Sequence, residues 1–178
     1  GAYYIRENDR NTTVRNSLRD KQYHVCDQTL CGEGKGRNDA GELDSEIRKD
    51  SNTPWTIFEA LNHGGPAYWK KHLDKLLKNY NTHGLKILFL VAYIDDDDFK
   101  NIYELKSEGN FEKVTDRYWT TLRTYSPEGC KCITNSCQDV SEIYNPDALG
   151  IKVFQCLYED SVGKHTVYHF FVHIRKNR

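Results

Sequence analysis

The chain has 178 residues, of which 29% are charged, and its formal net charge of -1 at pH 7 argues against the strongly basic composition of nucleic-acid-binding proteins. Its aromatic content of 12% argues against a disordered chain, and its length is typical of one domain with its own core. No apolar run approaches the roughly 18 residues of a membrane-spanning helix. We therefore expect a single domain over residues 1–178, with no nucleic-acid partner and no membrane span.

The N-terminal part of the chain, residues 1–53, is polar and has no sustained hydrophobic period. Only Tyr23 to Cys26 reads as a short strand, so we expect a loop-rich arm that disulfides tie to a main body over 54–178. The glycine-rich stretch Gly32 to Gly36 lacks the G-K-[ST] ending of a phosphate-binding loop and predicts a flexible turn.

Two helices are predicted at the start of the main body. Thr53 and Pro54 are typical of an N-cap and a first helical residue, which predicts a helix over 54–62. A second helix is predicted over 66–81, because apolar residues recur there on one helical face. These residues are Trp69, Leu73, Leu76, Leu77 and Tyr80.

The rest of the main body mixes strands and helices. The segment 85–94 is apolar on both alternating faces, which predicts a central strand covered on both sides. Helical spacing predicts helices over 99–108 and 111–124, and alternation predicts a hairpin over 151–175. The expected fold class is therefore α+β (or α/β), with a sheet of three to five strands.

The chain has six cysteines, five clustered at two places and one nearer the C-terminus: Cys26, Cys31, Cys130, Cys132, Cys137 and Cys156. An even, clustered set predicts disulfides formed in an oxidising compartment. Six cysteines permit 15 pairings and the spacing leaves them open, although we expect either Cys130 or Cys132 to reach the N-terminal pair. The alternative, a structural zinc site, matches the spacings only loosely.

Other features favour secretion. The chain contains no Met and begins with Gly1, as expected after removal of a signal peptide. Asn11 lies in an Asn-Thr-Thr sequon for N-glycosylation, within a polar segment that we expect to be exposed. Together with the cysteines, these features predict a secreted, extracellular glycoprotein.

Four consecutive aspartates follow the predicted central strand: Asp95, Asp96, Asp97 and Asp98. Carboxylates beyond the carboxyl end of a central strand can bind a metal ion or transfer protons. The same residues suit the cap of the helix expected over 99–108, because acids stabilise a helix N-terminus. Both interpretations stay open.

Three histidines occur at every fourth residue of the C-terminal strand: His165, His169 and His173. On a strand they share a face but lie about 13 Å apart, too far for one metal ion. The opposite face is more apolar, so we expect it to face the core and the histidines to be half-exposed. With Arg175 and Lys176 they would form a basic surface that gains charge below about pH 6.5.

No nucleophile motif such as G-x-S-x-G or H-E-x-x-H is present in the sequence. The 12 tyrosines exceed what one small core needs, and tyrosine is enriched at protein interfaces. We therefore expect a secreted, disulfide-stabilised binding protein, without a cofactor, that recognises an extracellular protein or a small ligand without turnover. The alternative is a small secreted hydrolase or nuclease that uses the acids at 95–98 or histidines such as His63 and His72.

Overall fold

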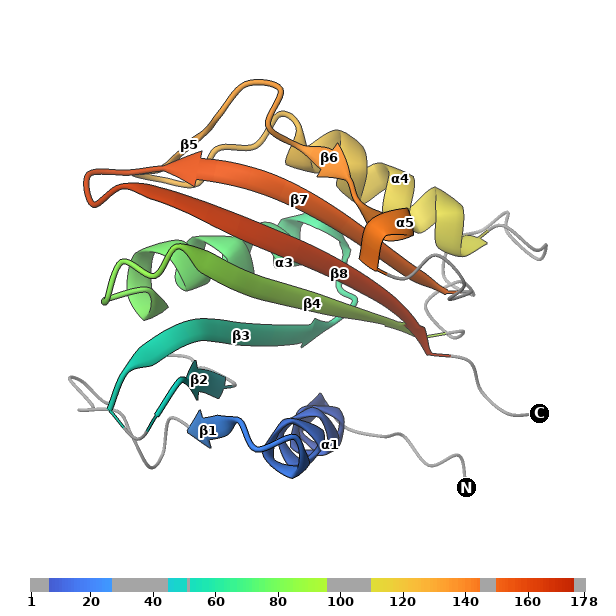
Figure 1. Ribbon diagram of the computed structural model, residues 1–178. Helices are drawn as coiled ribbons and strands as arrows, with labels where there is room; N and C mark the ends of the chain where they lie inside the picture. Colours follow the sequence, from blue (N-terminus) through green and yellow to red (C-terminus); the bar gives the residue numbers. More distant parts are fainter. Residues whose placement is uncertain (1–6, 27–44, 51, 96–109, 145–149, 175–178) are drawn as a thin grey trace, which may run out of the picture.

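The protein is a mixed α+β structure built on one open sheet (Figure 1). The computed structural model describes residues 7–26, 45–50, 52–95, 110–144 and 150–174. These residues contain eight strands, in the order β1-β2-β3-β4-β8-β7-β5, with β6 also pairing with β7. The sheet is therefore larger than the three to five strands expected, because short strands such as β5 and β6 leave no periodicity to read.

The strands are β1 (His24–Cys26), β2 (Ser45–Arg48), β3 (Pro54–Asn62), β4 (Ile87–Asp95), β5 (Lys131–Cys132), β6 (Gln138–Asp139), β7 (Ile151–Glu159) and β8 (Lys164–Ile174). The helices are α1 (Glu7–Asp20), α3 (Gly65–Lys75), α4 (Asn110–Leu122) and α5 (Ser141–Tyr144). A π-helical turn, η1 (Leu76–Tyr80), continues α3. Strands β3, β4 and β8 run parallel, and the other pairs are antiparallel.

The segment 54–62, predicted as a helix, is strand β3. Its side chains alternate between the two faces of the sheet: Ile57 packs with the residues of α3, and Phe58 packs on the opposite side. Thr53 does not cap a helix, because its backbone N–H donates to Asp50 in a turn before the strand. A buried strand with apolar residues on both faces contains apolar pairs at helical spacing too, which explains the wrong prediction.

The predicted helix over 66–81 is confirmed as α3 followed by η1. Pro66 lies in its first turn, where the missing N–H costs nothing. The predicted apolar stripe is buried throughout, and Trp69 and Leu73 have no exposed surface. This helix connects the parallel strands β3 and β4 and packs on one face of the sheet.

The predicted helix over 111–124 is confirmed as α4, and the hairpin over 151–175 is confirmed as β7 and β8. α4 packs on the same face of the sheet as α3, in one core cluster that includes Tyr118 and Phe171. We call this the helix-covered face; in Figure 1 both helices lie behind the strands. The helix expected over 99–108 lies outside the described residues.

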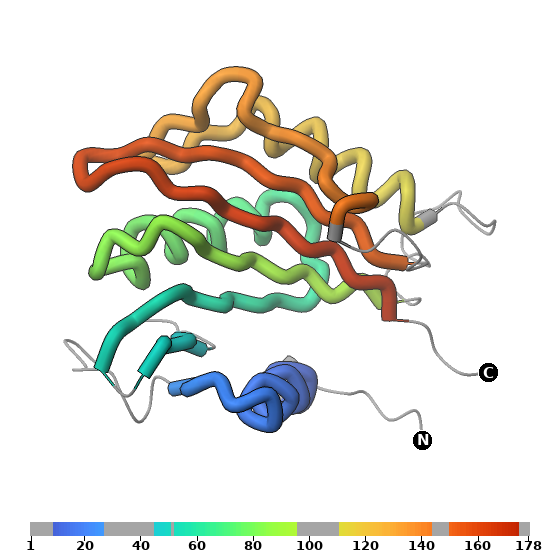
Figure 2. Tube along the Cα trace, in the orientation of Figure 1, coloured from blue at the N-terminus to red at the C-terminus, as the bar shows by residue number. Residues whose placement is uncertain are grey.

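The described residues of the N-terminal part, 7–26 and 45–50, form regular elements rather than the loops that the sequence predicts. They contain α1 and add β1 and β2 to the edge of the sheet, and Figure 2 shows this chain path in blue and teal. α1 lies on the opposite side from α3, where Val14 packs against a small cluster that includes Phe58 and Tyr93. The helix has no strong apolar stripe, which is why its sequence reads as polar.

Candidate functional site

The first of the four aspartates is held in a structural contact. Asp95 ends β4, and its carboxylate accepts a hydrogen bond from the Arg10 guanidinium at 3.0 Å. The same guanidinium donates to the Asn62 side chain at 2.7 Å and lies over the Tyr93 ring. Asp95 therefore attaches α1 to the carboxyl ends of β3 and β4. Asp96, Asp97 and Asp98 lie outside the described residues.

The two histidines considered for acid–base chemistry bond to different partners. His63 follows β3, and its Nδ1 lies 2.6 Å from the Tyr118 hydroxyl of α4. His72 of α3 lies 2.8 Å, through its Nδ1, from a carboxylate oxygen of Glu59, which is only 2% exposed. Sequence reasoning missed both contacts, because each joins residues on separate elements. The Glu59–His72 pair is buried, which makes it a connection between β3 and α3.

The predicted faces of β8 are reversed in the structure. His165 and His169 are buried on the helix-covered face, at 1% and 0% exposure, so the expected half-exposed stripe is wrong. His173 is half-buried and stacks on Phe111 of α4, with ring centroids 5.3 Å apart. Trp69 of α3 and Phe111 of α4 pack on the rings of His169 and His173. His165 instead makes polar contacts, with the Asp160 carboxylate at 3.1 Å and the Leu85 carbonyl at 2.9 Å. Arg175 and Lys176 lie outside the described residues.

His169 lies among aromatic side chains. Its ring centroid is 5.2 Å from that of Trp69 and 6.3 Å from that of Tyr158. Neither ring nitrogen has a hydrogen-bond partner among the described residues. Burial disfavours the charged imidazolium and lowers the pKa of His169 from 6.5 to about 3. This histidine is therefore neutral at physiological pH and cannot supply the pH-sensitive charge that the sequence suggested.

The C-terminal cysteines form one disulfide and contribute two thiols. Cys137 is bonded to Cys156 of β7, whereas Cys130 and Cys132 carry thiols, so they do not reach the N-terminal cysteines as expected. Burial raises the pKa of both thiols. Cys31 lies outside the described residues.

The glycosylation sequon is not exposed as the sequence suggests. Asn11 lies within α1 and is 1% exposed, and its side-chain oxygen accepts a hydrogen bond of 3.4 Å from the Tyr93 hydroxyl. A glycan attached to the side-chain nitrogen of Asn11 would separate α1 from the sheet at this position. The expectation of exposure is wrong, and this fold argues against a glycan at Asn11.

The sheet face opposite α3 and α4 carries an apolar surface that sequence reasoning did not identify. On this face the register places Phe89 of β4 beside Tyr168 of β8, which is beside Gln155 of β7. The Phe89 ring stacks on Tyr168 at 5.7 Å and contacts Phe170 at 6.1 Å. The next row toward the β7–β8 turn is formed by Ile87, Thr166 and Leu157.

We call this surface the open sheet face. Its apolar members are Ile87, Phe89, Leu157, Tyr168, Phe170 and Val172. Ile87 is 39% exposed, and the other five are half-buried. The two polar residues in the same rows, Thr166 and Gln155, are uncharged. α1 covers the β3 side of this face, where Val14 packs with Phe170 and Val172 in one cluster, and Figure 1 shows α1 below the strands β4, β8 and β7. The sequence shows that this face is apolar, but only the structure shows that it is partly uncovered.

The described residues contain no group of three metal-ligating side chains close enough to hold a metal ion. In the same part of the chain, no helix has the length and hydropathy to span a bilayer. No known protein family matches the chain, and no significant match was found among curated proteins or solved structures.

Proposed function

We propose that the protein is a secreted, disulfide-stabilised binding protein that recognises an extracellular protein through the open sheet face. The observation that carries this proposal is the composition of that face: six apolar side chains in adjacent rows, all at least partly exposed, with no charge among them. In a sheet with one face exposed to water, the residues that point to that face are normally polar. Contiguous exposed apolar surface of this kind marks interaction sites.

The size of the face fits the centre of a protein interface. Three strands at about 4.8 Å spacing and four rows at about 6.8 Å intervals give a projected area of roughly 300 Å². This is an upper bound for the exposed part, because Val91, Tyr93 and Val153 in the last two rows are buried. A stable interface buries about 800 Å² per partner, with an apolar core and a polar rim. The open sheet face would supply this core. Exposed groups around it, such as Ile143 of α5 at 76% exposure, would extend the contact.

A protein partner fits the shape better than a small ligand. Small-molecule sites are concave and enclose most of the ligand. Side chains in rows on one sheet face instead form a broad surface, with half-exposed aromatic rings of Phe89 and Tyr168 at its centre. Aromatic residues are enriched at the energetic centres of protein interfaces. Secretion is compatible with the disulfide between Cys137 and Cys156.

The alternative function, a hydrolase or nuclease, has no comparable support in the described part of the chain. Asp95 is paired with Arg10, and His165 and His169 are enclosed by the core. A general acid or base must be within hydrogen-bond reach of a substrate. These residues do not meet that condition.

The experiment is a binding screen against a panel of purified extracellular proteins. It compares the wild-type chain with Tyr168→Lys, which places a charge at the centre of the open sheet face. A matched control, Thr120→Lys, adds the same charge at an exposed position of α4, on the other side of the sheet. We expect the wild type and the control to bind the same partner, and Tyr168→Lys to bind it at least about thirtyfold more weakly.

Two results would contradict the proposal. The first is a screen in which every binder is retained by Tyr168→Lys, which would place recognition elsewhere. The second is a stable wild-type dimer in sedimentation velocity that Tyr168→Lys converts to monomers, because the face would then bind a second copy of the chain. Circular dichroism establishes that both variants are folded.

A further inference from the structure

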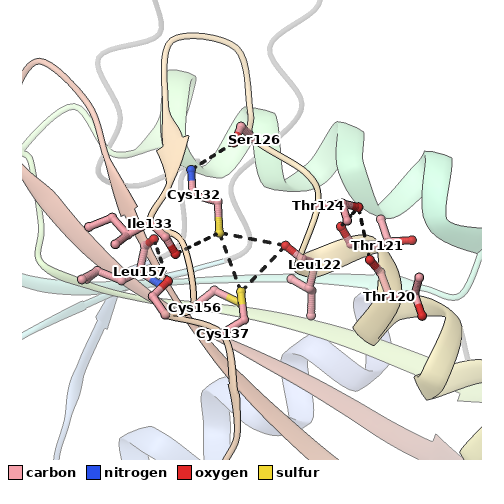
Figure 3. Close-up of a disulfide and its surroundings, with 11 residues drawn as sticks. Thr120, Thr121, Leu122, Thr124, Ser126, Cys132, Ile133, Cys137, Cys156 and Leu157 are labelled. Carbon is pink, nitrogen blue, oxygen red and sulfur yellow. Dashed lines mark hydrogen bonds between the residues drawn. A yellow bond between two sulfur atoms is a disulfide. The ribbon is translucent and has the colours of Figure 1, made fainter.

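Three sulfur atoms lie together where β5 and the segment before β6 meet β7. The Cys132 Sγ lies 3.7 Å from the Cys137 Sγ, and Cys137 is bonded to Cys156. Figure 3 shows the Cys132 side chain directed toward the disulfide, with the Leu122 carbonyl close to both Cys132 and Cys137. Cys137 therefore has two sulfur neighbours, one bonded and one in contact.

The second thiol of this region is placed differently. Cys130 lies two residues before Cys132, but its sulfur is 3.9 Å from a carboxylate oxygen of Asp160. A thiolate is repelled by that negative charge, and Asp160 contributes to the raised pKa of Cys130 after the larger effect of burial. No carboxylate of the described residues contacts Cys132. Burial raises the pKa of Cys132, and a hydrogen bond with Ser136 acts in the opposite direction.

We propose that Cys132 is the nucleophile of an intramolecular thiol–disulfide exchange that moves the Cys137 bond from Cys156 to Cys132. Exchange proceeds by attack of a thiolate on a disulfide sulfur, and Cys132 is already in contact with the sulfur that it would attack. The assignment rests on the arrangement of the three sulfurs and is independent of the function of the open sheet face.

The exchange balances without an external oxidant or reductant. Cys132 releases its proton to solvent, and the thiolate forms a bond to the Cys137 Sγ. The Cys137–Cys156 bond breaks, and Cys156 leaves with the electron pair and takes up one proton, which replaces the proton that Cys132 released. One disulfide and one thiol are present before and after.

The exchange changes what the disulfide holds together. The Cys137–Cys156 bond spans 19 residues and attaches the segment before β6 to β7. A Cys132–Cys137 bond would close a ring within that segment and release its covalent attachment to β7. Hydrogen bonds would still hold the segment, because the Ser136 hydroxyl accepts from the Leu157 backbone N–H at 3.0 Å and donates to its carbonyl at 3.2 Å. The result is two covalent isomers of one fold.

The experiment is disulfide mapping of the purified wild-type chain by mass spectrometry. Samples are incubated at pH 7.0 and pH 8.0, quenched with acid, and alkylated before digestion at low pH. We expect peptides of both isomers, with alkylated Cys132 in one and alkylated Cys156 in the other. The approach to their equilibrium should be about tenfold faster at pH 8.0, because the thiolate fraction rises tenfold per pH unit below the thiol pKa.

Two cysteine variants separate the proposal from unspecific exchange. Cys132→Ser should show only the Cys137–Cys156 bond and lose the second isomer completely. Cys130→Ser, the matched control, should retain both isomers at the wild-type rate. Detection of Cys137–Cys156 alone in the wild type after prolonged incubation at pH 8.0 would overturn the proposal. Exchange that requires Cys130 rather than Cys132 would overturn it as well.

Discussion

The burial of His169 makes a quantitative prediction about acid stability. A neutral histidine with a pKa of about 3 in the folded chain regains a pKa near 6.5 when the chain unfolds. The unfolded state therefore binds more protons between these values, so the free energy of unfolding falls as pH decreases. The loss begins near pH 6.5 and levels off below about pH 3. From pH 7.5 to pH 5 this one group lowers the free energy of unfolding by about 2 kcal/mol.

The assay is urea denaturation of the wild type and of His169→Phe at pH 7.5 and pH 5, with the free energy of unfolding extrapolated to water. Phe suits a site lined by the rings of Trp69 and Tyr158. The decrease between the two pH values should be about 2 kcal/mol smaller in the variant. His83→Gln, which changes an exposed histidine, should keep the wild-type decrease. An equal decrease in wild type and His169→Phe would refute the assignment of His169 as a buried neutral group.

Three further substitutions test contacts that hold the fold together, each by urea denaturation. Leu73→Ala removes a side chain with no exposed surface from α3 and should cost about 2–5 kcal/mol; a loss below 1 kcal/mol would contradict this packing. Asp95→Asn should cost about 1.5–3 kcal/mol by weakening the pair with Arg10, and a double-mutant cycle that shows no coupling would exclude the pair. Tyr118→Phe should cost about 0.5–1.5 kcal/mol through the lost hydrogen bond to His63. In a His63→Ala background the same substitution should cost nothing, and an unchanged cost there would exclude the hydrogen bond as the cause.

The parts of the fold that the sequence predicts correctly are those whose hydrophobic period is unambiguous. The stripe of α3 recurs over three turns with lysines on the opposite side, so only a helix satisfies it. β4 is apolar at nearly every position and is the predicted central strand, but it is covered on both sides only from Leu90 onward, because Ile87 and Phe89 are partly exposed on one face. In these elements local sequence and tertiary packing favour the same structure.

Predictions were wrong where one pattern satisfies two structures. The segment 54–62 has apolar residues at both helical and strand spacing. It forms a strand because β3 pairs with β2 on one side and β4 on the other. β8 has two faces that are both rich in rings, and the more apolar of them is not the buried one. The positions of α3 and α4 decide which face is covered, and this information is absent from the sequence of β8 itself.

The candidate site depends on the same missing information. Phe89 and Tyr168 are apolar positions in predicted strands, so the sequence assigns them to the core. Their partial exposure arises because α1 packs over the β3 side of that face and leaves these two side chains half-buried. Conversely, the polar context of Asn11 suggests exposure, yet α1 places it against Tyr93. The exposure of Phe89 and Tyr168 and the burial of Asn11 are therefore determined by which distant elements pack over them, and not by residue type.

The most direct test of the central claim, that the open sheet face is the binding surface, is carbene footprinting of the chain with and without a protein partner obtained from the panel. The reagent labels side chains that are accessible to solvent. We predict that labelling of Phe89, Leu157 and Tyr168 falls severalfold in the complex, while labelling of Thr120 on α4 is unchanged. Protection of α4 with unchanged labelling of Phe89 and Tyr168 would contradict the claim and move the binding surface to the helix-covered side.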